Sequence, residues 1–406
     1  MAKILISFLG TGGLIQKTED PKTVHEPREY RAAEYRMGDD SLGEHSFLSL
    51  ALKQHTNADS IILIGTPHSM WDALYLKLND GKDDDIYYEI ADACEKASHD
   101  SQLKIPHQKL LEEKLGKNSH IILIKYGINE NELNENIEKV LEINQFIHDR
   151  DELIVDVTHG FRSLPILIMQ LLFYLQTVSN KHINISHIYY GMLEAALELK
   201  YAPVVDLKRT LDISQWITAA DEFKNFGNAH QISKLLEGED KEAAQRLAKF
   251  SDLMNLNHLC GIRSAAQDLA AIKDRQYDSI LPNMVVTPIV KEFYNKFHNV
   301  EPLSLFELRL AEWQMQHHNY TAAYLTVTEA IVTNVCERTK NLDPDIKEDR
   351  EAAKDLLKKL DRLSPIYHKV VGRRNDLAHA RDTSKSADSM IRTLKESINQ
   401  LKEKIK

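Results

Sequence analysis

The sequence predicts an α/β half with a mostly parallel sheet, followed by an all-α half. Up to about residue 203, short apolar runs rich in Ile, Val and Leu alternate with helical patterns. This strand–helix–strand spacing is typical of βαβ units. After Pro203 no segment has the pattern of a strand, and Leu-, Ala- and Lys-rich segments with helical spacing dominate.

The elements of the first half follow from these runs. Strands are expected at Lys3–Leu9, Ser60–Ile64, His120–Tyr126, Glu152–Val157 and Ser186–Tyr190, with Tyr30–Arg36 as a short polar addition. Helices are expected at about Glu44–His55, Asp85–Ser98, Leu133–His148 and Phe161–Val178. Because these strands are uniformly apolar, helices should cover both faces of the sheet.

The second half is expected to be helical throughout. The candidate helices are Ile213–Phe226, Lys241–Cys260, Ile262–Lys273, Val286–Phe297, Leu303–His317, Tyr320–Thr339, Glu348–Val371 and Asp388–Lys404. The boundary is placed near Ala202–Leu207. We therefore expect domains at 1–203 and 204–406, the second divided into connecting helices at about 206–300 and a helical core at about 301–406.

Composition excludes several classes of protein. The chain has 406 residues, of which 43% are hydrophobic and 28% charged, as in globular proteins with a packed core. No apolar run approaches the roughly 18–20 residues that span a bilayer, and no cleavage site follows the apolar residues 1–10. We therefore expect a cytoplasmic protein with no membrane partner.

Cysteines and charge narrow the class further. Cys94, Cys260 and Cys336 are far apart, which excludes a disulfide framework, and no His/Asp/Glu cluster has the spacing of a metal site, so no metal is expected. The net charge is −10, yet residues 351–406 hold 14 Lys/Arg against 8 Asp/Glu. A basic end on an acidic chain indicates an anionic partner there, or simply a solvated basic face.

Three loops at expected strand ends have the chemistry of a ligand site. They are Gly10-Thr11-Gly12-Gly13, Gly65-Thr66-Pro67-His68 and Asp156-Val157-Thr158-His159-Gly160. Parallel sheets bind ligands at these ends, where glycines allow close approach and a helix N-terminus attracts phosphate. A phosphate-containing ligand is the first interpretation, and plain turn chemistry is the second. The incomplete G-x-G-x-x-G pattern disfavours a dinucleotide dehydrogenase.

The third loop also matches a DxTHG motif between an apolar strand and a helix. With Ser7-Phe8-Leu9-Gly10-Thr11-Gly12 and Ile188-Tyr189-Tyr190-Gly191, it resembles the DxTHG-motif CRISPR-associated proteins of type III systems, over roughly residues 1–203. The resemblance implies a Rossmann-like CARF sensor domain. It also implies a cyclic oligoadenylate ligand, bound across the twofold axis of a homodimer or of a higher even-numbered oligomer, and favours four adenylates over six.

The resemblance assigns ligand-facing positions in all three loops. They are Gly10, Thr11 and Gly12 in the first, Thr66, His68 and Trp71 in the second, and Thr158, His159, Gly160 and Arg162 in the third. Asp156 is anionic and a poor contact for phosphate. We therefore expect its carboxylate to hold the third loop through hydrogen bonds to backbone N–H groups.

A second candidate site lies near the C-terminus, where Arg374, Asn375 and His379 form an R-x4-H pattern. Asn375 and His379 share one face of a helix, whereas Arg374 lies about 140° from His379 around an ideal helix. The motif therefore needs a break in the helix, which Gly372 directly before it favours, or completion by a second subunit.

These residue types suit metal-independent cleavage of RNA. Histidine moves protons near neutral pH, and arginine is a fixed cation for the charge that develops on phosphate. The surrounding helices and the Arg-polar-x3-His pattern resemble the HEPN ribonucleases. That resemblance implies a HEPN-type core at 301–406, single-stranded RNA as substrate and two motifs meeting in one dimer cleft, with Glu329 as a buried acid of the neighbouring helix.

Together the motifs predict a homodimeric ribonuclease that needs no cofactor for cleavage and is activated by cyclic oligoadenylate. Two alternatives stay open. The first is a nucleotide-sensing regulator whose helical half binds nucleic acid without cutting it. The second is a ring nuclease that degrades its own ligand with Thr11, Thr158 or His159.

Overall fold

The computed structural model describes residues 1–12, 30–378 and 386–405. The chain divides into two compact units, Met1–Asp212 and Ile213–Lys406, and each is described by itself. The division falls within helix α8 (Lys208–Phe226), nine residues beyond the boundary expected at 203. No helix among the described residues is long and apolar enough to cross a membrane.

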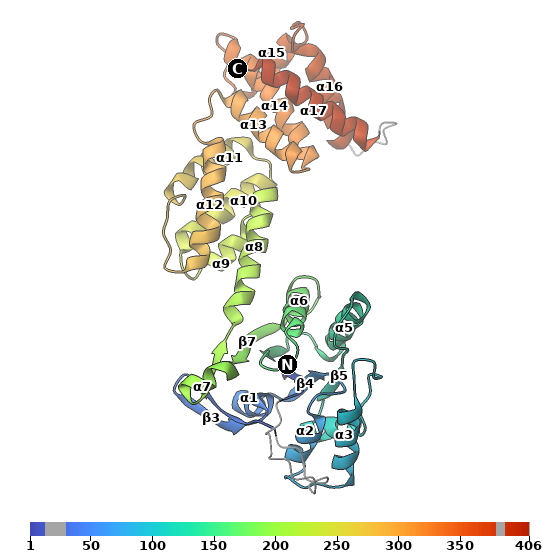
Figure 1. The fold of residues 1–406 in the computed structure, drawn as a ribbon. Coiled ribbons are helices and arrows are strands. Elements are labelled where there is room, and N and C mark those ends of the chain that lie inside the picture. Colours follow the sequence, from blue (N-terminus) through green and yellow to red (C-terminus); the bar gives the residue numbers. More distant parts are fainter. Residues whose placement is uncertain (13–29, 379–385, 406) are drawn as a thin grey trace. The chain divides into compact units, whose positions relative to one another are not determined.

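The first unit is a sheet flanked by helices (Figure 1). Its strands are β1 (Lys3–Leu9), β2 (Ala33–Met37), β3 (Asp40–His45), β4 (Ser60–Gly65), β5 (His120–Leu123), β6 (Glu152–Asp156), β7 (Asn184–Gly191) and β8 (Ala202–Asp206). Its helices are α1 (Leu48–Thr56), α2 (Trp71–Leu78), α3 (Asp85–Lys96), α4 (Gln108–Leu115), α5 (Glu130–Glu142), α6 (Ser163–Thr177) and α7 (Ala196–Leu199), with short 3-10 turns η1 (Ile143–Phe146) and η2 (Leu193–Ala195).

Within the described residues the strands form one sheet in the order β3-β2-β8-β7-β6-β1-β4-β5. All pairings are parallel except β2–β3 and β7–β8. The mostly parallel sheet is thus confirmed. The sequence missed β8, because Pro203 indicated the end of the α/β region. In the structure Pro203 lies inside β8, between β2 and β7.

Helices cover both faces of the sheet, as expected. Side chains of a strand alternate between its faces. Leu5 of β1 joins one core with α1 to α4, whereas Ile4 and Ile6 join the other with α5, α6 and the start of α8. Figure 1 shows α5 and α6 on the face opposite α1 to α3. Because β1 pairs in parallel with both β4 and β6, the carboxyl ends of these three strands lie together at one end of the sheet.

Only helices occur in the described part of the second unit. They are the rest of α8, then α9 (His230–Leu236), α10 (Lys241–Asn255), α11 (Leu259–Asp268) with η3 (Leu269–Ala271), α12 (Ile280–Phe297), α13 (Leu303–Gln316), α14 (Tyr320–Arg338), α15 (Lys347–Leu357), α16 (Ser364–Ala378) and α17 (Ala387–Lys404). They build two apolar cores. Helix α13 contributes to both, with Phe306 and Leu310 in the first and Leu308 and Ala311 in the second.

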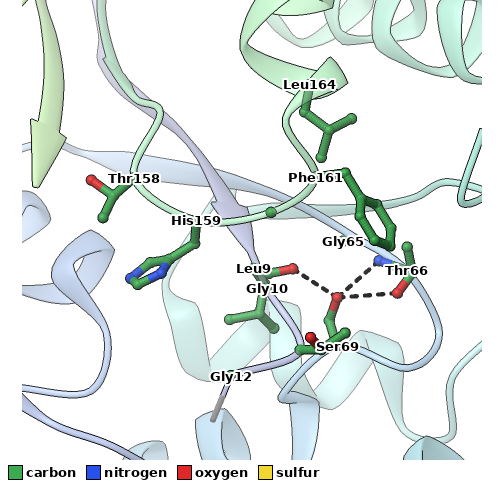
Figure 2. A pocket seen from close by; sticks show the side chains of 12 residues that line it. Leu9, Gly10, Gly12, Gly65, Thr66, Ser69, Thr158, His159, Phe161 and Leu164 are labelled. Atoms are coloured by element: carbon green, nitrogen blue, oxygen red, sulfur yellow. Dashed lines mark hydrogen bonds between the residues drawn. The ribbon is translucent and has the colours of Figure 1, made fainter. Parts of the chain in front are cut away.

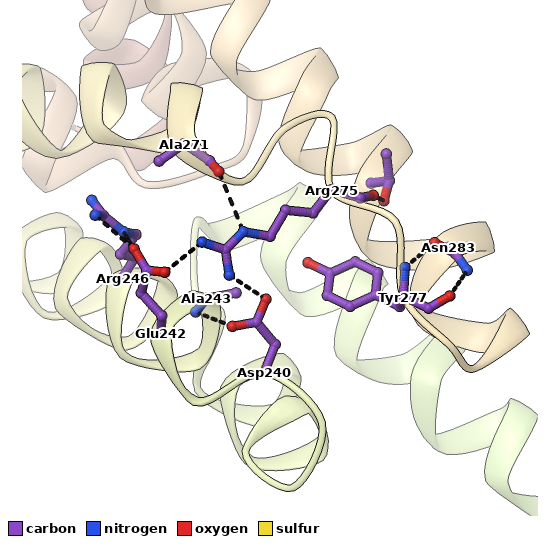
Figure 3. Close-up of polar contacts among 9 residues, drawn as sticks. Asp240, Glu242, Ala243, Arg246, Ala271, Arg275, Tyr277 and Asn283 are labelled. Carbon is purple, nitrogen blue, oxygen red and sulfur yellow. Dashed lines mark hydrogen bonds and ion pairs between the residues drawn. The ribbon is translucent and has the colours of Figure 1, made fainter.

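Arg275 joins separate helices around the first of these two cores (Figure 3). Its guanidinium donates to Asp240 Oδ2 and to Glu242 Oε2, both at 2.5 Å, and its Nε donates to the carbonyl of Ala271. Asp240 also caps α10 by accepting the N–H of Ala243 at 2.9 Å. A side chain that bonds two helix ends at once fixes the loop after η3 against the start of α10.

Several expected element limits were wrong. The expected helix Glu348–Val371 is two helices, α15 and α16, because Pro365 lacks an N–H and fits only the first turn of a helix. The expected helix from Glu44 starts instead at Leu48, after β3. The short helices α2, α4 and α9 were missed, since seven or eight residues give too few turns for a periodic signal.

Candidate functional site

The three loops expected to bind a ligand meet at one cavity of about 230 Å³ (Figure 2). They follow β1, β4 and β6, which are adjacent and parallel, so their carboxyl ends lie together. The lining comprises Leu9, Gly10, Thr11, Gly12, Gly65, Thr66, Ser69, Thr158, His159, Gly160, Phe161 and Leu164. Seven of the ten expected ligand-facing residues are among them.

The third loop is held by the Asp156 carboxylate, as expected. Asp156 is fully buried and accepts the N–H of Thr158 at 3.0 Å and the hydroxyl of Ser7 at 2.6 Å. Thr158 Oγ1 in turn accepts the N–H of Gly191 at 2.7 Å. These bonds join the loop to β1 and to the end of β7.

Glycine at position 160 is required by the backbone. Its φ is +94°, in the region that favours glycine, and a Cβ there would lie 3.0 Å from Leu164 Cδ1 and 3.2 Å from Phe8 Cβ. The chain can therefore turn sharply from β6 into α6. Phe161, two residues before α6, and Leu164, in its first turn, line the cavity, so the positive end of the helix dipole lies beside it.

His159 lies in this cavity wall; the residue is half-buried and its Nε2 is buried. Burial lowers the pKa of the imidazole, and the nearby Asp156 carboxylate opposes that shift only in part. The ring is therefore neutral at pH 7. Among the described residues no partner bonds its Nε2. A neutral imidazole with a free nitrogen can donate to or accept from a ligand, depending on its tautomer.

Ser69 lines the cavity too, and sequence reasoning missed it. Its hydroxyl donates to the carbonyl of Leu9 at 2.7 Å and accepts the N–H of Thr66 at 3.0 Å, as Figure 2 shows. It thus ties the first loop to the second. The signal was present, because a serine three residues after a threonine in a Pro-containing turn is typical of a side-chain-to-backbone turn.

Three expected ligand residues do not line the cavity. Trp71 is fully buried, and its indole Nε1 donates to the carbonyl of Thr66 at 2.8 Å, so it supports the second loop from the core. The Nδ1 of His68 lies 2.7 Å from the carbonyl of Cys94, and so the ring is turned toward α3. Arg162 is exposed at the residue before α6.

The second candidate site is described in part. Arg374 and Asn375 lie in the last turns of α16, with Arg374 Nη1 donating to Asn375 Oδ1 at 3.1 Å. His379 lies outside the described residues. The expected break at Gly372 was wrong, since α16 is continuous through that residue to Ala378. Glu329 is half-buried and forms an ion pair with Arg350.

The described residues contain no group of three or more His, Cys, Asp or Glu side chains that could hold a metal ion.

Two segments of the chain match models of known protein families. Residues 4–194 match the model of the CARF domain of the CRISPR system endoribonuclease Csx1. Residues 212–302 match the second domain of CRISPR-associated protein MJ1674. These matches support a CRISPR-associated CARF protein. The CARF match covers all three cavity loops, and the second match covers most of the stretch assigned to connecting helices.

One relative matches nearly the whole chain. CRISPR-associated protein MJ1674 of Methanocaldococcus jannaschii is 32% identical over 96% of this chain, which spans 63% of the length of that relative. Among solved structures, Enterococcus italicus Csm6 bound to cyclic hexa-2'-fluoro-hexa-dAMP aligns with 99% of this chain and 93% of its own, at 11% identity and a TM-score of 0.41. A likeness at that level carries no argument about this chain.

Proposed function

We propose that this CARF protein is an ancillary endoribonuclease of a type III CRISPR system, activated by a cyclic oligoadenylate. The observation that carries the proposal is the meeting of the three loops at one cavity within the matched CARF domain. Threonine hydroxyls, backbone N–H groups and a helix N-terminus line it, which suits phosphate and ribose.

The cavity size favours a ligand shared between two chains. At about 230 Å³ it is smaller than the roughly 300–1,000 Å³ of pockets that enclose a drug-sized ligand. One chain would therefore hold only part of a ring of nucleotides. A homodimer would present two copies of the loops to one symmetric ligand, so a ring with twofold symmetry, such as cyclic tetra-adenylate, fits best.

Cleavage is assigned to Arg374, Asn375 and His379. The 2′-hydroxyl of the RNA attacks the adjacent phosphorus, its proton is taken up by a base, and the bond from phosphorus to the 5′-oxygen breaks as that oxygen gains a proton. His379 would move these protons, and Arg374 would stabilise the charge on the phosphate oxygens. Asn375 holds the Arg374 guanidinium. The products are a 2′,3′-cyclic phosphate and a 5′-hydroxyl.

Allosteric control follows if the ring binds one arrangement of the dimer better than the other. A ligand shifts a conformational equilibrium only through this difference in affinity. The helical region 212–302 connects the sensor to the α16 motif in the chain. We propose that it transmits the change.

The test uses the purified protein, a fluorogenic single-stranded RNA and EDTA, with cyclic tetra-adenylate or cyclic hexa-adenylate added. We expect ring-dependent cleavage that is lost in His379→Ala, with Arg381→Ala as the matched control. Cleavage unchanged by His379→Ala would overturn the catalytic assignment. Binding of a ring without any cleavage would favour the regulator, and loss of the ring without added RNA would favour a ring nuclease.

A further inference from the structure

A cleft in the helical unit, separate from the α16 motif, has the chemistry of a nucleic-acid surface. It lies between α12, α13 and α17 and has a volume of about 650 Å³. Its floor is apolar, with Leu308 and Trp313 buried and Leu305 half-buried. Its rim is polar, and the exposed residues there are Asn295, Lys296, Arg309, Gln316 and Lys402.

The cations of this cleft are only partly neutralised by the protein. Lys402 forms an ion pair of 2.6 Å with Glu312, the one acid among the described residues that line the cleft. Neither Lys296 nor Arg309 has an ion-pair or hydrogen-bond partner in the part of the chain that the structure describes. Two unpaired cations facing one cleft attract an anion. The chain as a whole has a net charge of −10, so this cleft is a local excess of positive charge on an acidic protein.

A smaller cavity of about 40 Å³ continues the cleft along α12. It shares Lys296 and Trp313 with the cleft and adds Lys224 and His317, with Glu292 as its acid. The basic rim thus extends from α17 past α12 to α8. An elongated basic groove follows a polymer backbone better than a compact ligand.

The cleft lies away from the proposed catalytic motif along one helix. Near the motif, Tyr324 bonds the carbonyl of Met390 at the start of α17, and Lys369 pairs with Glu396 one to two turns further on. Lys402 follows Met390 by twelve residues, which is about 18 Å at 1.5 Å per residue. An RNA strand that reached both places would have to span several nucleotides.

We propose that this cleft binds the phosphate backbone of a single-stranded RNA through Lys296 and Arg309, and so holds one part of the substrate while a part several nucleotides away reaches the α16 motif. The inference rests on the proposed ribonuclease function and adds to it a substrate-binding surface. The amides of Asn295 and Gln316 offer hydrogen bonds to bases or ribose, which a purely electrostatic surface would not.

The experiment measures binding, so it does not depend on cleavage. A fluorescent 20-nucleotide RNA with every 2′-hydroxyl methylated is titrated with the 406-residue protein at several salt concentrations. The test variant is Lys296→Glu with Arg309→Glu. The control is Lys234→Glu with Lys249→Glu, two exposed lysines of the same unit that do not line the cleft. Thermal unfolding checks that both variants are folded.

We expect the test variant to raise the Kd about tenfold or more and to reduce the slope of log K against log salt by about 1.4, or about 0.7 for each lost phosphate contact. The control should leave both unchanged. Equal effects of the two variants, or no effect of either, would overturn the proposal. So would an equal loss for a DNA duplex of the same length, since that shows a general attraction to anions. If the wild type binds this RNA through the cleft but never cuts unmodified RNA, the proposed nuclease fails while the cleft assignment stands.

Discussion

The side chains of Ser7 and Asp156, on neighbouring parallel strands, are joined by a buried hydrogen bond of 2.6 Å from Ser7 Oγ to Asp156 Oδ2. The other carboxylate oxygen of Asp156 accepts the N–H of Thr158. One side chain therefore links the first cavity loop's strand to the third loop. A fully buried carboxylate that is doubly hydrogen-bonded rigidifies its surroundings, because an alternative position would leave it unpaired.

Replacing this carboxylate should loosen the site. We expect Asp156→Ala to lower the free energy of unfolding of the N-terminal unit by about 1–3 kcal/mol, since it leaves the half-buried N–H of Thr158 and the buried hydroxyl of Ser7 without partners. Binding of cyclic tetra-adenylate, measured by calorimetry, should weaken with it. Ser7→Ala is the control and should cost less, because Asp156 keeps its bond to Thr158. Wild-type affinity in Asp156→Ala would show that the loop does not need this anchor.

Glycine 160 should resist substitution for two separable reasons. In Gly160→Ala, the alanine has to adopt a positive φ, and its Cβ crowds Leu164 and Phe8. Gly38→Ala is the matched control, because Gly38 also has a positive φ (+60°) but has no atom within 4 Å of an added Cβ. We expect Gly38→Ala to cost about 1 kcal/mol for the backbone alone and Gly160→Ala to cost more, with loss of ring binding. Equal melting temperatures of the two variants would contradict the close approach at Gly160.

Asn375 should act on catalysis through Arg374. Its amide oxygen accepts from Arg374 Nη1 at 3.1 Å. We expect Asn375→Ala to reduce kcat for RNA about 10- to 100-fold with little change in KM, since a misplaced cation loses interactions made in the transition state. Arg374→Lys should not restore activity, because a lysine lacks the planar fork. A rise in KM with unchanged kcat would assign Asn375 to substrate binding instead.

Glu307 should make the stability of the helical unit depend on pH. It is buried on α13, and desolvation raises the pKa of its carboxyl from 4.5 to about 8, although the Thr333 hydroxyl and Arg350 favour the charged form. Glu329 and Glu337 also face it and favour the neutral form. Between pH 4.5 and 8 the folded state holds a proton that the unfolded state lacks, so the free energy of unfolding falls as pH rises.

The slope is at most about 1.4 kcal/mol per pH unit for one proton. We expect Glu307→Gln to flatten this dependence in urea unfolding measured from pH 5 to 8. At pH 8 the variant should have a higher free energy of unfolding than the wild type. The control is Glu312→Gln, which removes a half-buried acid of the same helix that is already ion-paired with Lys402. An unchanged slope in Glu307→Gln would show that Glu307 is already ionised in the fold.

Local patterns in the sequence were sufficient for the class of fold and for most of the first site. The strands at Lys3–Leu9 and Glu152–Asp156 are apolar runs, and Gly10, Thr158 and Gly160 directly follow such runs. The carboxyl ends of parallel strands lie on one edge of a sheet whatever the details of packing. Residues next to those ends could therefore be placed together from the sequence.

The tertiary structure alone decided which polar and aromatic side chains reach the cavity. Trp71 was expected at the ligand, yet packing against β4 buries it, and its N–H supports the Thr66 carbonyl. Ser69 takes the place beside the cavity because its hydroxyl reaches the carbonyl of Leu9, sixty residues away in the chain. Likewise Pro203 lies in a strand because β2 and β7 flank it. In each case the deciding contacts come from residues distant in sequence, and no local pattern encodes them.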